Sequence, residues 1–143
     1  MARLIHRLTT ETRVHHGSFD LLDEGGPRSL PQPANAPGGG LLRAADNTIT
    51  ALSATPGVHY AAVDLEVWDG EPPPADGAWH PAGNATLRLS SGEVEVNPLV
   101  EGDDTEMLII GPPGTYALRA SVITRSAPNG VERWLFQFWP ARS

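Results

Sequence analysis

Apolar and polar residues alternate with a period of two along most of this chain. Residues 3–15 form the longest such stretch, in which one set of alternate positions includes Leu4 and Leu8 and the other includes Arg7 and Glu11. Because successive side chains of a β-strand point to opposite faces, this pattern predicts a strand. Its mostly charged face is expected to face water.

The C-terminal third of the chain predicts two long strands, over residues 115–125 and 131–139, separated by an Asn-Gly turn. Asn and Gly accept the positive φ that a tight hairpin turn requires. Alternation places Trp134, Phe136 and Phe138 on one face of the second strand. We therefore predict that this hairpin is the centre of an all-β core.

Shorter apolar stretches between turn residues predict further strands. Two pairs of them are separated by Asp46-Asn47 and by Ser91-Gly92, which favour hairpins. No stretch has helical periodicity. The pattern predicts an antiparallel β-sandwich of eight or nine strands, with a small barrel as the alternative. These shorter strands are expected over residues 41–45, 48–53, 58–69, 84–90, 93–97 and 106–110, and residues 18–23 are expected to be a short strand or an edge segment.

A chain of 143 residues is long enough for one domain, and we expect residues 1–143 to form a single β-sandwich domain. Two segments rich in Pro and Gly interrupt the strand pattern, at 24–40 and at 71–82. They contain few large apolar side chains, so we expect both to be long surface loops.

The net charge of -7 is unevenly distributed. Residues 46–106 carry twelve acidic residues and one Arg, a net charge of -11, whereas the segments before and after them have net charges of +1 and +3. An acidic surface repels nucleic acid and anionic membranes and attracts basic proteins. An acidic surface that serves only solubility is the alternative.

The chain has no cysteine, which excludes disulfides, thiolate zinc sites and a cysteine nucleophile. It has neither the apolar run of a signal peptide nor an apolar stretch long enough for a membrane-spanning helix. A cytoplasmic location is therefore expected.

Three segments together resemble the competence protein J family of small β-sandwich nuclease inhibitors. They are the His-x-x-Phe-x-Leu segment at 16–21, the Gly-Leu-x-x-Ala-Ala-Asp-x-x-Ile segment at 40–49 and the Gly-x-Tyr-x-Leu segment at 114–118, followed by an aromatic final strand. The resemblance implies a β-sandwich that occupies the site of a basic nuclease, or a comparable toxin, as an immunity protein does. Carboxylates can take the place of phosphates against Arg or Lys of such a partner.

The candidate partner-binding site is an outward-facing Trp surrounded by carboxylates. Alternation places Val63, Leu65 and Val67 on the core side of their strand, and the acidic residues between them on the other side. Trp supplies a large anchor, and carboxylates steer a basic partner. The alternative is that Trp68 packs under the Pro-rich loop. The predicted contact residues are Asp64, Glu66, Trp68, Asp69, Glu71, Asp76, Trp79, Glu101, Asp103 and Asp104.

No catalytic or metal-binding pattern is present. The chain lacks a nucleophile elbow, a zinc-protease motif and a phosphate-binding Gly loop. Asp64 and Glu66 share one strand face, as a pair of glycosidase carboxylates could, but no substrate cleft is evident. The adjacent His15 and His16 would point to opposite faces, and segment 101–106 lacks the spacing of a calcium loop. We expect no enzymatic activity, no metal and no cofactor.

Exposed aromatic residues suggest a second class of function. Trp68, Trp79 or Trp139 could each provide a flat surface on which a sugar ring stacks. The alternative hypothesis is thus a carbohydrate-binding or structural β-sandwich module without catalytic activity.

Overall fold

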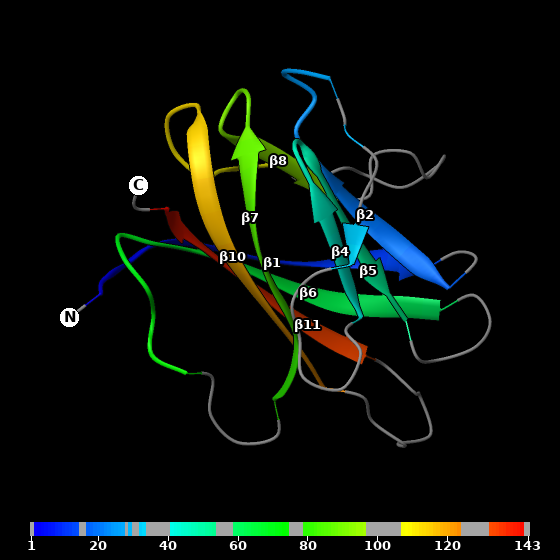
Figure 1. The fold of residues 1–143 in the computed structure, drawn as a ribbon. Helices are drawn as coiled ribbons and strands as arrows, with labels where there is room; N and C mark the ends of the chain where they lie inside the picture. The colour runs from blue at the N-terminus through cyan, green and yellow to red at the C-terminus, as the bar shows by residue number, and fades with distance from the viewer. Residues whose placement is uncertain are drawn as a thin grey trace.

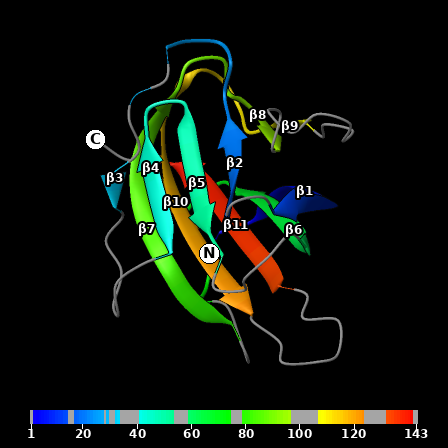
Figure 2. The same ribbon diagram turned by 90° about the vertical axis from the view of Figure 1, so that its right-hand side faces the viewer.

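Two β-sheets packed face to face make up the computed structural model of this chain (Figures 1 and 2). No helix occurs within the described ranges, so none of them contains a helix that could cross a membrane. The structure describes residues 2–14, 17–27, 29, 32–33, 41–53, 59–74, 79–96, 107–123 and 132–141.

The first sheet has five strands and the second has six. The order in the first sheet is β1 (Leu4–Val14), β6 (His59–Trp68), β11 (Glu132–Pro140), β10 (Gly114–Ile123) and β7 (His80–Leu89). The order in the second is β3 (Gln32–Pro33), β4 (Leu42–Ala45), β5 (Thr48–Leu52), β2 (Ser18–Leu22), β8 (Glu93–Val96) and β9 (Met107–Ile109). The predicted all-β sandwich is confirmed, and the small barrel is not formed.

Most neighbouring strands are antiparallel, as predicted, but β11 runs parallel to β6. The final strand lies between β6 and its own hairpin partner β10, so it has one parallel and one antiparallel neighbour. The predicted pairing of β10 with β11 is confirmed, and the turn predicted between them lies outside the described residues. Carboxylates of β6 and side chains of β11 are consequently neighbours, although they are distant in sequence.

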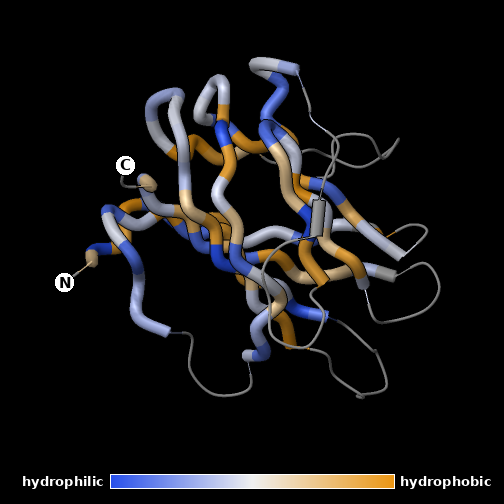
Figure 3. The backbone as a smooth tube through the Cα atoms, viewed as in Figure 1, coloured by the Kyte–Doolittle hydropathy of each residue, from blue (hydrophilic) through white to orange (hydrophobic). Residues whose placement is uncertain are grey.

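The core lies between the sheets and is centred on three aromatic rings. Trp134 and Phe136 stack with ring centroids 5.7 Å apart, and Phe19 of the other sheet packs edge-on against both. These rings are almost completely buried, as is Phe138, so the predicted aromatic core is confirmed. Figure 3 shows hydrophobic and hydrophilic stretches alternating along the strands that surround it. Edge-on and stacked pairs of this kind contribute about 0.5–1.5 kcal/mol beyond their buried area.

A buried polar cluster joins the two sheets at one end of the sandwich. The Asp23 carboxylate accepts hydrogen bonds from the backbone N–H groups of Gly25 (2.8 Å), Ser91 (2.9 Å) and Gly92 (3.1 Å), and from the Ser91 hydroxyl (2.7 Å). Asn47 adopts the left-handed conformation, with φ of 63°, in the predicted Asp46-Asn47 turn, and its side chain bonds Ser90. The hairpin predicted on either side of this turn is confirmed as β4 and β5.

The hairpin predicted at Ser91-Gly92 is wrong, because this turn leads from one sheet to the other. β7 pairs with β10 in the first sheet, whereas β8 pairs with β2 and β9 in the second. Gly92 takes a φ of +77° at the crossing. The Asp23 carboxylate holds the backbone of this turn in place, which allows the chain to change layers without a longer connection.

Both predicted surface loops contain some strand structure. β3 is a two-residue strand within segment 24–40, and β7 begins at His80, inside segment 71–82. β7 also contains Pro81, which cannot donate a backbone hydrogen bond. Because β7 is the last strand of its sheet in the described part of the chain, its outer edge tolerates a proline.

Candidate functional site

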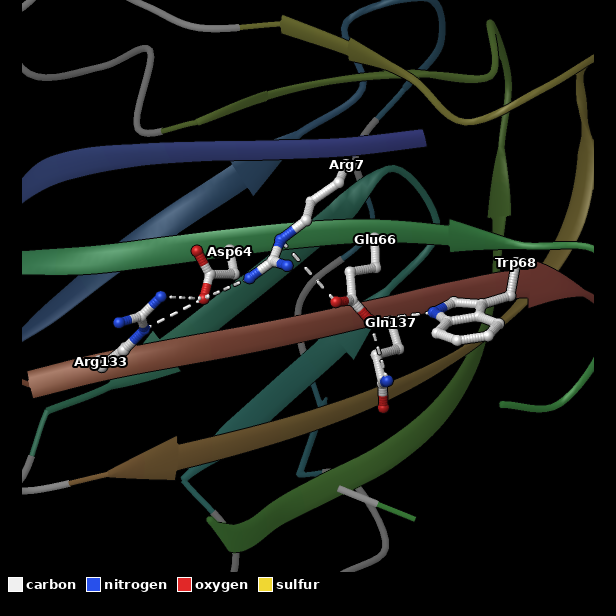
Figure 4. Close-up of polar contacts among 6 residues, drawn as sticks. All are labelled: Arg7, Asp64, Glu66, Trp68, Arg133 and Gln137. Atoms are coloured by element: carbon white, nitrogen blue, oxygen red, sulfur yellow. Dashed lines mark hydrogen bonds and ion pairs between the residues drawn. The ribbon is translucent and has the colours of Figure 1, made fainter. Parts of the chain in front are cut away.

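The centre of the predicted site lies on the outer face of the first sheet. Val63 and Leu65 of β6 are buried in the core, so Asp64 and Glu66 point to the other side of the sheet, as alternation predicts. Both carboxylates are nevertheless inaccessible, since Asp64 is only 1% exposed and Glu66 only 9%. Neighbouring side chains of the outer face, drawn in Figure 4, cover them.

Two arginines from the neighbouring strands neutralise Asp64. Arg133 of β11 donates to Asp64 Oδ2 through Nη2 at 2.9 Å and through Nε at 3.1 Å. Arg7 of β1 places its Nη2 3.7 Å from the same oxygen. The Oδ1 atom of Asp64 is buried and has no hydrogen-bond partner in the described part of the chain. The arginines are half-exposed, so the carboxylate is sealed below a cationic surface.

Glu66 is tied into the same outer face by hydrogen bonds. Its Oε1 atom accepts from Gln137 Nε2 at 3.0 Å and from Trp68 Nε1 at 2.9 Å, and its Oε2 atom lies 4.0 Å from Arg7 Nε. Three strands, β1, β6 and β11, therefore contribute to one continuous polar network (Figure 4). Two of the carboxylates predicted to bind a partner, Asp64 and Glu66, are thus already bound within the protein.

Asp69 and Glu71 follow β6, and both are exposed. Asp69 is fixed against the start of β1, where its Oδ1 accepts from the backbone N–H of Arg3 at 2.7 Å. Burial lowers the pKa of the Arg119 guanidinium, and the charges of Glu71 and then Glu66 oppose that effect. Glu71 therefore lies close enough to Arg119 for their opposite charges to interact.

Arg119 of β10 holds the proline segment after Glu71 against the sheet. It donates to the carbonyl oxygens of Pro72 (3.1 Å) and Pro73 (2.6 Å) and to Gln137 Oε1 (2.9 Å), and its guanidinium lies 5.8 Å from the centre of the Trp139 ring. Beside it is an open cleft of about 270 Å³ whose walls include Glu71, Asn84, Arg119 and Trp139. An aromatic ring next to amide, carboxylate and guanidinium groups offers both stacking and hydrogen bonding to a small polar ligand.

The structure therefore assembles only part of the predicted site. Asp64, Glu66 and Trp68 form one hydrogen-bonded group, and Asp69 and Glu71 are exposed at its end. Trp79 is half-buried just before β7. The remaining predicted residues, Asp76, Glu101, Asp103 and Asp104, lie outside the described residues. No group of three or more His, Asp or Glu side chains that could hold a metal occurs among the residues described.

Sequence reasoning missed the basic half of this network. Arg7 and Arg119 do occupy outward positions of predicted strands, but nothing in the sequence indicates which carboxylate each one faces. The parallel pairing of β6 with β11 brings Arg133 to Asp64, 69 residues away. That register was the missing information.

Comparison with known proteins identifies the fold. No protein-family model matches the chain, and no curated protein matches its sequence. By its architecture the chain is a β-sandwich of the kind formed by a small nuclease inhibitor. Its structure is similar to the crystal structure of ComJ from Bacillus subtilis, an inhibitor of the DNA degrading activity of NucA, with a TM-score of 0.61, 10% sequence identity and coverage of 99% of both chains. The expected likeness in fold to competence protein J is confirmed.

Proposed function

We propose that this chain binds a nuclease with a basic surface and inhibits it, without itself catalysing a reaction. The observation that carries the proposal is the similarity in fold to ComJ over almost the full length of both chains. The charge distribution supports it independently, because segment 46–106 has a net charge of -11. A nuclease must attract phosphates, and a protein rich in exposed carboxylates competes for the same basic residues.

Different carboxylates would serve this function in different ways. Asp69 and Glu71 are exposed and can reach a partner directly, as we also propose for Asp76, Glu101, Asp103 and Asp104. Trp68 and Trp79 would supply apolar contact area. The burial of Asp64 and Glu66 supports an indirect part for them, that of positioning Arg7, Arg133 and Trp68 on the outer face.

A pull-down followed by a nuclease assay tests the proposal. The immobilised chain is incubated with lysate of the source cells at about 50 mM and at about 500 mM salt, because exposed charge pairs weaken as the Debye length shortens. We expect a basic protein to be retained at low salt and released at high salt. The released protein should degrade plasmid DNA, and addition of the free chain should stop the degradation.

An unrelated acidic protein of the same net charge is the control bait. It should retain less of the nuclease, because a matching surface contributes to affinity in addition to charge. The proposal fails if the chain retains no nuclease, or if a retained nuclease keeps its activity in the presence of excess chain.

A carbohydrate-binding module is the second candidate function, and the cleft beside Trp139 is the observation in its favour. The indole ring and the polar groups of Asn84 and Glu71 could bind one sugar ring. This function predicts that Trp fluorescence changes when the chain is titrated with a glycan that it binds. The fluorescence change should be absent in Trp139→Ala. It predicts no salt-dependent retention of a nuclease.

A further inference from the structure

The outer face of β8 and β9 combines exposed apolar side chains with carboxylates. In the antiparallel register Glu93 is opposite Ile109, and Glu95 is opposite Met107, so these four side chains occupy adjacent positions on one face. Met107 is 50% exposed and Ile109 is 58% exposed. β9 is the last strand of the second sheet in the described part of the chain, and Figure 2 shows it with β8 beyond β2. Two large apolar side chains are therefore presented at an edge of the sandwich.

Three carboxylates lie beside Met107 and Ile109. Glu24, from the turn after β2, lies with Glu93, Glu95 and Met107 along a shallow groove of about 210 Å³. Among the described residues, none of these three carboxylates forms an ion pair with an arginine, in contrast to Asp64 on the other sheet. Within the part of the chain that the structure describes, no arginine cancels the negative field of this edge, and this field suits a positively charged partner.

The backbone below this groove is held in place before any partner binds. Asp23 bonds the backbone N–H groups of Gly25, Ser91 and Gly92, which are the residues beside Glu24 and Glu93. The backbone N–H of Ile110 donates to Gly92 O at 2.7 Å and so fixes the end of β9 to the same turn. A preorganised surface loses less conformational entropy on binding than a loose one.

From these observations we infer that the outer face of β8 and β9 is the main docking surface for the basic nuclease. This inference rests on the proposed function. We call this face the β8–β9 surface, and it consists of Glu24, Glu93, Glu95, Met107 and Ile109. An Arg or Lys of the partner can lay its aliphatic stem on Met107 and Ile109 while its charged group reaches Glu93 or Glu95. Met is enriched in protein interfaces, and residues that lose their water completely on binding dominate the binding energy.

Charge reversal on each of two surfaces tests this location. Glu93→Lys/Glu95→Lys changes the β8–β9 surface, and Asp69→Lys/Glu71→Lys makes the same change in net charge at the end of β6. The probe is the nuclease retained by the wild-type chain at about 50 mM salt. We expect the first variant to weaken its binding at least about tenfold. The second changes the direct contacts proposed above for Asp69 and Glu71, which are secondary to the β8–β9 surface, and should weaken binding only about threefold.

Apolar truncation provides a second comparison that leaves the net charge unchanged. Met107→Ser/Ile109→Ser should raise the dissociation rate at least about tenfold. Its matched control is Leu4→Ser/Ile5→Ser, which removes two exposed apolar side chains from β1 and should have little effect. Near-UV circular dichroism of each variant verifies that the aromatic core is intact.

The outcomes separate failure of the location from failure of the function. Equal losses for both charge-reversal variants, or a larger loss for the change at Asp69 and Glu71, would place the contact elsewhere while leaving the inhibitor function in place. An unchanged dissociation rate in the Met107 and Ile109 variant would also overturn the inference. If the wild-type chain retains no nuclease, the proposed function fails, and the docking surface fails with it.

Discussion

Removing the two arginines over Asp64 should destabilise the protein more than removing Asp64 itself. In Arg7→Gln/Arg133→Gln the Asp64 carboxylate, which is 1% exposed in the wild-type chain, loses both cations, which lie 3.7 and 2.9 Å away. An uncompensated buried charge typically lowers the free energy of unfolding by about 3–5 kcal/mol. In Asp64→Asn the remaining arginines are 50% and 47% exposed and can turn into water, so we expect a loss of only about 1–2 kcal/mol.

Combining the changes should recover stability. The triple variant Arg7→Gln/Arg133→Gln/Asp64→Asn contains neither the buried charge nor the cations, and we expect it to be more stable than the double arginine variant by about 2–3 kcal/mol. Urea unfolding followed by Trp fluorescence measures all three, because Trp134 is completely buried in the native core. An Asp64→Asn variant that is less stable than the double arginine variant would refute the reasoning.

The same variants separate a structural from a binding role for Asp64. If its role is to position Arg7 and Arg133, Asp64→Asn should keep most of its affinity for the nuclease at temperatures where it is folded. A loss of binding at least as large as that of Glu93→Lys/Glu95→Lys, with unchanged stability, would instead mean that Asp64 contacts the partner directly.

Three further predictions concern the turns that join the sheets. Asp23→Asn places an amide against backbone donors and should lower the free energy of unfolding by about 2–3 kcal/mol in urea titrations, whereas Ser91→Ala should lose about 1 kcal/mol. Gly92→Ala should lower the free energy of unfolding by more than the roughly 1–2 kcal/mol that the left-handed conformation alone costs, because the added Cβ would meet the Gly111 carbonyl. A smaller loss of stability would mean that this turn can shift. At the turn between β9 and β10, the Tyr116 hydroxyl donates to the Pro112 carbonyl at 2.6 Å. Burial raises the pKa of Tyr116 above its usual 10.0, so the folded state holds this proton more tightly than the unfolded state. Stability should therefore fall above about pH 10, and the fall should be shallower in Tyr116→Phe when thermal unfolding is measured against pH.

The strands and the core could be predicted because alternation is a local property. Two neighbouring side chains of a strand must point to opposite faces, so the sequence of β11 was enough to bury Trp134, Phe136 and Phe138. The Asp46-Asn47 turn was equally local, since Asn accepts the positive φ that it adopts there. Pairing between strands is not local, as the Ser91-Gly92 turn illustrates. The same residues can form a turn between two paired strands of a hairpin or a turn between strands of different sheets.

The sequence by itself determined that Asp64 and Glu66 face away from the core and that segment 46–106 is strongly acidic. Only the tertiary structure decided which of those carboxylates remain available to a partner. A charge is neutralised by what lies within a few ångströms, and in a sheet those neighbours belong to other strands. The pairing of β6 with β1 and β11 supplies arginines to Asp64, whereas the pairing of β8 with β9 supplies Met107 and Ile109 to Glu95 and Glu93.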